Sequence, residues 1–226
     1  MSEERAITAG GLIRAAVARL LAPPFLPLFV LSLFVSTVAA SFAEQVDDVS
    51  LISSIALAVV SAYLQIAIVL ATAEQAPSPS ADVWIKAAFR RRCFWRFALA
   101  SLFSFVLVFA GVLVLVIPGF IVGACVSMGP IAAVLERTGP GDSLRRSTAL
   151  SKPARRAVGT VFGLFVILPT ALQVALYLNA DVFPLGLWIG LGLELITVIL
   201  FLVSLLALSQ AFLLLGGERK PLPAKS

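Results

Sequence analysis

Residues 51–73 read LISSIALAVVSAYLQIAIVLATA and contain no charged side chain. An apolar run of about 18 residues or more is long enough to cross a bilayer as a helix. Hydrocarbon offers no water to bond the backbone, so a spanning segment must be a helix or part of a closed barrel. The strict alternation typical of barrel strands is missing here. The stretch therefore predicts a transmembrane helix.

The rest of the chain has the same character. Of its 226 residues, 60% are hydrophobic and 13% are charged, with a mean hydropathy of +1.05. A soluble domain is nearer half apolar, with about a quarter of its residues charged. Further apolar runs occupy residues 25–43, 97–117, 120–135 and 157–178 and a stretch within 185–216. We expect an all-α polytopic membrane protein with six transmembrane helices, the fourth kinked or broken at Pro130.

The basic residues predict the orientation. All 17 Lys and Arg residues fall before the first span, between spans two and three, between four and five, or after the sixth. The opposite connections hold only the acidic residues Glu44, Asp47, Asp48 and Asp181. The positive-inside bias predicts a multi-pass protein with both termini in the cytoplasm. A signal peptide cleaved after Ala43 is the alternative for the first span, although residues 1–24 form a long region ahead of its apolar core.

Three segments ahead of expected membrane hairpins share a layout. LIRAA (12–16), WIKAA (84–88) and LRRST (144–148) each set a basic residue before two small ones. Each predicts a short amphipathic helix on the cytoplasmic surface, with Asp142 a candidate cap of the third. Three such units predict pseudo-threefold packing of the hairpins. The single membrane domain would comprise an amphipathic segment (1–24), a hairpin (25–73), two units of interfacial helix plus hairpin (80–135 and 141–216) and a tail (217–226).

The basic residues are also candidate contacts for lipid phosphate. Each Lys or Arg near an anionic membrane surface contributes about 1 kcal/mol to attraction, and free amides at a helix start add to it. The alternative is that these side chains only fix topology and reach nonspecifically to headgroups. The candidates are Arg145, Arg146, Lys152, Arg155, Arg156, Lys86 and Arg91.

Glu194 is the one acidic residue deep in an apolar run. Desolvation there favours its neutral form, and Gln65 and Gln173 in other spans are candidate hydrogen-bonding partners. A proton or substrate site is one interpretation of this intramembrane polar group. The other is a structural hydrogen bond, or a carboxylate near the outer surface.

The sequence offers little for catalysis. It has no histidine, the commonest general base and metal ligand. Cys93 and Cys125 suggest neither a disulfide nor a metal site. The loop GPGDSLRRS (139–147) lacks the Lys-Ser/Thr pair of a nucleotide-binding loop, and no strand precedes it. We therefore expect no enzyme activity, no cofactor and no nucleic-acid partner.

A family resemblance rests on VLVIPGFIV (114–122) followed by MGPIAAVLERTGPGDSLRRSTALSK (128–152). These segments resemble the six-helix membrane domain joined to some bacterial glycerophosphoryl diester phosphodiesterases. The residues that carry the resemblance are Pro118, Gly119, Pro130, Gly139 and Pro140. The resemblance implies a fold and a location in the bacterial inner membrane but not hydrolysis, because the metal-binding acids and histidines of such catalysis are missing. The glycine and aromatic residue expected after Lys152 are also replaced, by Pro153-Ala154-Arg155.

Together these features predict a scaffold or accessory module. It would engage anionic phospholipid or a partner protein through its basic cytoplasmic face. Its partners would be the lipid bilayer and either another membrane protein or further copies of itself. The alternative is a small transporter or channel in which Glu194 and the broken fourth helix line a path.

Overall fold

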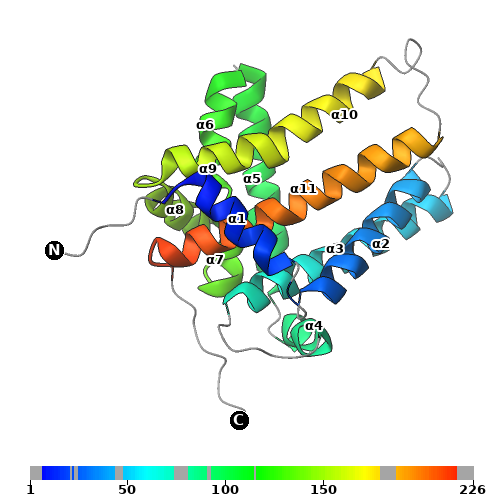
Figure 1. Cartoon of the computed structure of the whole chain (residues 1–226), viewed down its shortest axis with the longest axis horizontal. Helices are drawn as coiled ribbons and strands as arrows, with labels where there is room; N and C mark the ends of the chain where they lie inside the picture. The colour runs from blue at the N-terminus through cyan, green and yellow to red at the C-terminus, as the bar shows by residue number, and fades with distance from the viewer. Residues whose placement is uncertain are drawn as a thin grey trace.

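The structure is a computed structural model that describes residues 7–20, 22, 25–43, 48–73, 81–90, 93–114, 116–178 and 187–217. Within these ranges the chain is all-helical and contains no strand (Figure 1). The elements in chain order are α1 (Ala9–Leu20), α2 (Leu26–Ala43), α3 (Asp48–Ala73), α4 (Ala81–Arg90), α5 (Phe94–Val114), α6 (Val116–Val126), α7 (Gly129–Leu135), α8 (Pro140–Ser151), α9 (Arg155–Phe162), the π-helix η1 (Gly163–Ile167), α10 (Leu168–Leu178) and α11 (Leu187–Leu214).

Five helical segments of the described chain are long and apolar enough to cross a membrane. They are Leu51–Ala73, Phe94–Leu113, Pro118–Leu135, Arg155–Leu176 and Leu195–Leu214. A sixth apolar helix is α2, in which the described side chains include the apolar stretch Leu26–Val35. The chain is therefore a helical membrane protein, and the sixth span remains a prediction.

Prolines account for two irregularities in the spanning segments. The expected break of the fourth span is present: α6 ends at Val126, and α7 begins at Gly129 with Pro130 in its first turn. Pro169 near the start of α10 lacks an amide proton and its ring crowds the preceding turn. The helix widens just before it, so that the amide of Leu168 bonds the carbonyl of Gly163 five residues earlier in η1.

Three helical hairpins repeat one packing pattern. Hairpin 1 is α2 and α3, hairpin 2 is α5 and α6–α7, and hairpin 3 is α9–η1–α10 and α11. In each, the first arm packs on its own second arm and on a second arm of the preceding hairpin in cyclic order: α2 on α11, α5 on α3, and α9 on α6. The contacts between the hairpins thus follow the expected pseudo-threefold arrangement.

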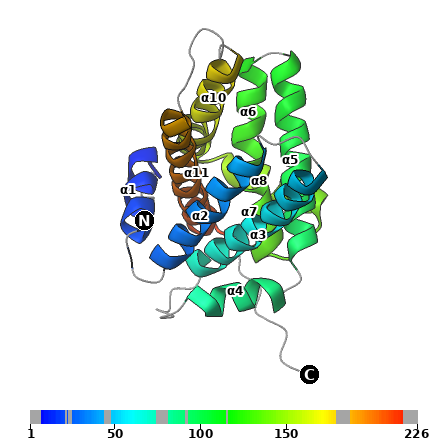
Figure 2. The same cartoon turned by 90° about the vertical axis from the view of Figure 1, so that its right-hand side faces the viewer.

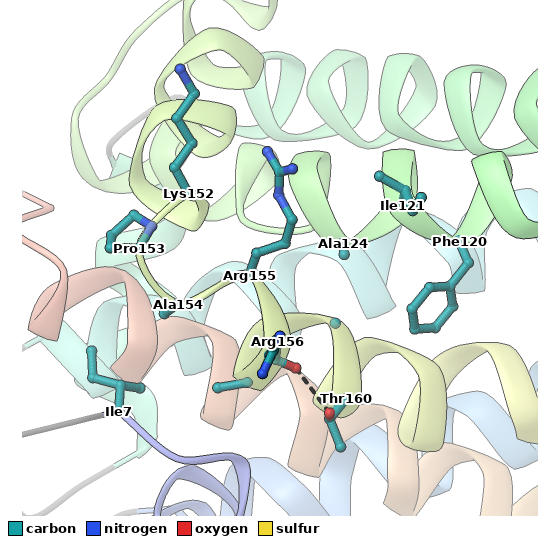
Figure 3. A pocket seen from close by; sticks show the side chains of 12 residues that line it. Ile7, Phe120, Ile121, Ala124, Lys152, Pro153, Ala154, Arg155, Arg156 and Thr160 are labelled. Atoms are coloured by element: carbon teal, nitrogen blue, oxygen red, sulfur yellow. Dashed lines mark hydrogen bonds between the residues drawn. The ribbon is translucent and has the colours of Figure 1, made fainter.

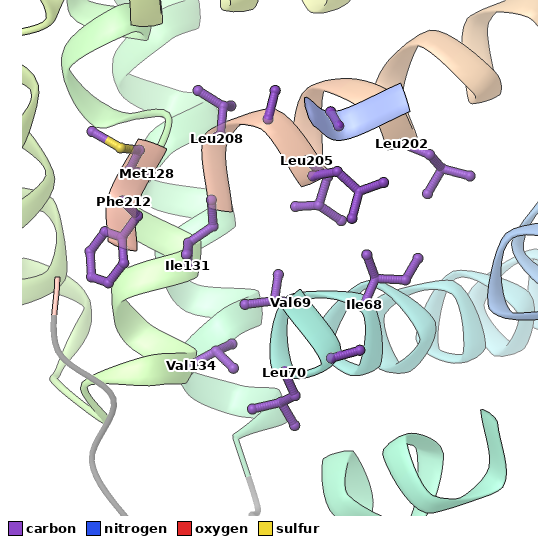
Figure 4. Close-up of a cluster of buried hydrophobic side chains, with 14 of the residues drawn as sticks. Ile68, Val69, Leu70, Met128, Ile131, Val134, Leu202, Leu205, Leu208 and Phe212 are labelled. Carbon is purple, nitrogen blue, oxygen red and sulfur yellow. The ribbon is translucent and has the colours of Figure 1, made fainter. Parts of the chain in front are cut away.

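The second arms meet at the centre and form the core. The share of buried residues is 44%, 67% and 61% in the spans of α3, α6–α7 and α11, against 11% and 33% in those of α5 and α9–α10. Figure 4 shows their side chains gathered in one cluster. Fully buried members include Val69 of α3, Val134 of α7 and Phe212 of α11.

The three short helices follow the same cyclic order. α1 packs on α11 and α9 of hairpin 3, α4 on α3 of hairpin 1, and α8 on α7, α5 and α6 of hairpin 2. Figure 2 shows α4 lying at the end of α3. Each short helix thus contacts the hairpin before it. The expected cap by Asp142 is wrong: α8 starts at Pro140, whose fixed φ suits a first helical position, and its N-cap is Gly139 without a side-chain bond.

Candidate functional site

A cationic cleft opens where α8 turns into α9 (Figure 3). Its volume is about 830 Å³. Lys152 is the C-cap of α8, while Arg155 and Arg156 begin α9, so the tight turn at Pro153-Ala154 places the three cations at the cleft. Phe120, Ile121 and Ala124 of α6, with Ile7, supply an apolar wall.

The three cations of the cleft are available to a ligand. Lys152, Arg155 and Arg156 are exposed, and none forms an ion pair with a described residue. The N-cap of α9 is Ala154, which provides no side-chain bond to the first-turn amides. The positive end of the α9 dipole adds to the positive potential of the cleft. Basic groups beside an apolar wall match a phosphate joined to hydrocarbon.

The α6–α9 contact holds the cleft's apolar wall against its cationic turn. The ring of Phe120 lies where a side chain at Gly163 would project, and the ring of Phe162 lies where one at Gly123 would project. A Cβ at Gly159 would only make contact with Phe120, at 3.6 Å. These glycines therefore serve close helix contact within one chain.

The other predicted lipid contacts are placed differently. Arg146 donates from Nε to Glu136 Oε1 at 3.0 Å and from Nη2 to the Gly216 carbonyl at 3.0 Å. Lys86 pairs with Asp82 on the exposed face of α4. Arg145 lines a separate hollow of about 320 Å³, which shares only Lys152 with the cleft. Arg91 lies outside the described residues.

The residues that carry the family resemblance lie at helix starts and at a close helix contact. Pro118 lies in the first turn of α6 rather than at the end of the third span, and Gly119 faces Gly111 of α5. Pro130 begins α7, and Gly139 and Pro140 begin α8. Ser147 of α8 secures the break by donating to the Cys125 carbonyl at 2.7 Å and accepting from the Met128 amide at 3.2 Å. Sequence reasoning missed this role of Ser147.

Gln65 of the predicted intramembrane polar group lies between two cavities. One, of about 150 Å³, is lined by α2, α3 and α11; the other, of about 400 Å³, lies at the α6–α7 break. Gln173 is half-buried on α10 and is not among the residues that line either. Glu194 belongs to α11, but its side chain lies outside the described part, so its pairing with either glutamine stays a prediction.

No sequence signal marked Phe120 and Ile121 as site residues, because they belong to an ordinary apolar run. Their place in the cleft follows from the crossing of α6 and α9. No group of three or more His, Cys, Asp or Glu side chains suited to a metal ion occurs in the described residues. Comparison with protein families, curated proteins and solved structures finds no match to this chain.

Proposed function

We propose that this protein is a non-catalytic, multi-pass protein of the bacterial inner membrane that holds anionic phospholipid in the cationic cleft. The observation that carries the proposal is the meeting of Lys152, Arg155 and Arg156, without acidic partners in the described structure, and the apolar wall at Phe120. A phospholipid presents the complementary chemistry, an anionic phosphate next to acyl chains. Three cations near such a surface contribute about 3 kcal/mol.

The orientation of the protein in the membrane and its family relationship form part of the same proposal. The location of all Lys and Arg residues supports cytoplasmic termini and a cytoplasmic cleft. The segments 114–122 and 128–152 support a relationship to the membrane domain of the phosphodiesterase family. In this role the protein is a scaffold or accessory module. A partner protein or a further copy would assemble with it at the leaflet that supplies its bound lipid.

The test compares two variants of equal charge. Arg155→Gln with Arg156→Gln removes two cations of the cleft, whereas Arg14→Gln with Lys86→Gln removes two exposed cations elsewhere. Each full-length protein is reconstituted with phosphatidylglycerol and phosphatidylcholine, repurified, and its bound lipid quantified. We expect about thirtyfold less phosphatidylglycerol on the cleft variant, because it loses two attractions of about 1 kcal/mol each, and little change on the control. Equal retention by both variants, or an equal loss, contradicts a specific lipid site.

A second candidate, a small transporter or channel, is favoured by the 400 Å³ cavity at the α6–α7 break. Broken membrane helices line substrate sites in many transporters. Glu194→Gln would then abolish pH-dependent flux into proteoliposomes, with Thr197→Val on the same helix as the control for disturbed packing. Flux that is absent in the wild type, or unchanged by Glu194→Gln, rejects this candidate.

A further inference from the structure

The larger intramembrane cavity has a wall of mixed chemistry. It lies among α3, α5, the α6–α7 break, η1 with α10, and α11. Its volume of about 400 Å³ falls within the range of small-molecule sites, about 300–1,000 Å³. Most of its lining is apolar, and none of the described residues that line it is charged. Its polar side chains are Gln65, Ser101, Ser104, Ser127, Thr170 and Ser204.

These polar groups can accept hydrogen bonds. Hydroxyls donate along the backbone: Ser127 to the Ala124 carbonyl at 3.2 Å, Thr170 to Val166 at 2.7 Å and Ser204 to Phe201 at 2.7 Å. A hydroxyl whose proton is used in this way keeps lone pairs for a ligand. Gln65 donates its amide to Ser61 Oγ at 3.4 Å, which leaves its amide oxygen as a further acceptor. The wall therefore suits an uncharged group that can donate a hydrogen bond, and without a charged residue in its described lining it disfavours a desolvated anion.

The cavity reaches the lipid-facing surface of the protein. Phe105 of α5 is 65% exposed and Thr170 of α10 is also exposed, and both belong to candidate membrane spans. A ligand entering between these helices comes from the bilayer rather than from water. Irregular backbone at the α6–α7 turn and in η1 lines the same space, as expected where non-helical backbone borders a cavity in a membrane.

A buried, unpartnered hydroxyl lines the smaller cavity on the other side of Gln65. The smaller cavity shares Gln65 and Phe201 with the larger one and adds Ser32 and Thr197. Ser32 is 3% exposed, and its Oγ has no hydrogen-bond partner among the described residues. Leaving such a group unpaired costs about 1–3 kcal/mol, so a polar occupant here is favourable. Its partner can be the head of a ligand or a water that the head contacts.

We propose that the cavity binds an uncharged, membrane-soluble molecule whose polar end is an alcohol, with that hydroxyl at Gln65 and the hydrocarbon between α5 and α11. The site is separate from the cationic cleft and does not depend on the phospholipid proposal. It does not depend on the transport candidate either, since binding can occur here whether or not the ligand crosses the membrane.

The experiment uses the full-length protein in bilayers and three photoreactive probes with the same long alkyl chain. One is a primary alcohol, one its methyl ether and one the corresponding carboxylate. We expect the alcohol to label cavity residues of α5 and α11 about fivefold more than the ether, the effect of one hydrogen bond, and the carboxylate to label them least.

Two matched variants locate the effect. Ser104→Leu fills the cavity and should suppress labelling by the alcohol, whereas Ala110→Leu adds the same side chain to an exposed position of α5 and should not. Gln65→Leu should remove the preference for alcohol over ether while labelling by the ether persists. Thermal unfolding confirms that each variant is folded.

Three outcomes overturn the proposal: no labelling of the cavity, equal labelling by alcohol and ether, or equal suppression by Ser104→Leu and Ala110→Leu. The pair Arg155→Gln and Arg156→Gln should leave alcohol labelling unchanged. In this variant, retained cleft lipid contradicts the phospholipid proposal, whereas in the unsubstituted protein an unlabelled cavity contradicts the present one, so the two proposals fail separately.

Discussion

Where α5 and α6 run side by side, Gly111 faces Gly119 with no room for a methyl group between them. A Cβ added at Gly119 would lie 2.6 Å from the Val112 backbone nitrogen and 2.9 Å from the Gly111 carbonyl carbon. Backbone atoms cannot move aside as a flexible side chain can. Close contact of this kind is a main source of helix association in lipid, where no hydrophobic force acts between helices.

We therefore predict that Gly119→Ala lowers the stability of the protein by about 1–3 kcal/mol, the usual cost of overpacking. The measurement is the midpoint of thermal unfolding in detergent micelles. Gly192→Ala is the control, because a Cβ there meets nothing within 4 Å. Similar midpoints for the two variants would show that α5 and α6 adjust freely.

Arg146 connects three parts of the chain through Glu136 at the end of α7 and the carbonyl of Gly216 after α11. We predict that Glu136→Gln costs about 1–2 kcal/mol, because the Glu136 side chain is 9% exposed and its ion pair with Arg146 becomes a bond to a neutral oxygen. Faster amide exchange at residues 213–217 would report the loosened contact. Asp82→Asn is the control, since the exposed Lys86–Asp82 pair contributes little. Exchange at residues 213–217 that stays at the wild-type rate would contradict this role of Arg146.

Sequence reasoning could identify the basic residues but could not separate their roles. Arg145 and Arg146 are neighbours, yet Arg146 bonds residues 10 and 70 positions away while Arg145 borders a hollow. Such pairings depend on tertiary contact. Local chemistry also misleads in places, since Asp142 has the residue type of a cap but lies within the first turn of α8.

At the scale of single elements, α1 is held by one apolar face. Leu12, Ala16 and Leu20 are buried, and Arg19 donates from Nη1 to the Thr72 carbonyl at the end of α3 at 3.1 Å. The helix therefore covers α11 and α9 rather than lying on lipid alone.

We predict that Ala16→Glu detaches α1, because it places a carboxylate at a position that is 0% exposed. Ala15→Glu, one residue earlier on the exposed side, should leave the helix in place. Limited proteolysis within residues 9–20 measures the difference. Equal cleavage of both variants would mean that α1 is not docked as described.

Hydropathy predicts most of the membrane-spanning helices, because the length of an apolar run is what allows a segment to cross the bilayer. The break at Pro130 also follows from the sequence, since proline cannot continue the hydrogen-bond ladder. The widened turn at η1 was not foreseen. A helix can relieve the clash with the ring of Pro169 either by a kink or by a π-turn. Packing of η1 against α6 and α11 contributes to which of the two forms.

At the scale of the whole molecule, a departure from the threefold order explains where the larger cavity forms. The second arms are irregular in one hairpin only, because α6–α7 is broken whereas α3 and α11 are continuous. Three similar units therefore cannot close symmetrically, and the 400 Å³ space lies beside the break. The sequence predicts the repeat from its spacing. It cannot predict the space, whose walls come from five separate parts of the chain.

The last prediction concerns the side of the membrane on which each short helix lies. Placing cations such as Lys86, Arg90 or Arg145 in the external loops would require their transfer across hydrocarbon during insertion, which the positive-inside bias disfavours. In a variant with Cys93 and Cys125 replaced by alanine, Lys86→Cys and Ala149→Cys should resist a membrane-impermeant maleimide in intact cells and react after permeabilisation. Asp181→Cys, in a connection without basic residues, should react in both conditions. Labelling of Lys86→Cys from outside would reverse the orientation, place the cationic cleft on the outer leaflet, and require a different source for its lipid.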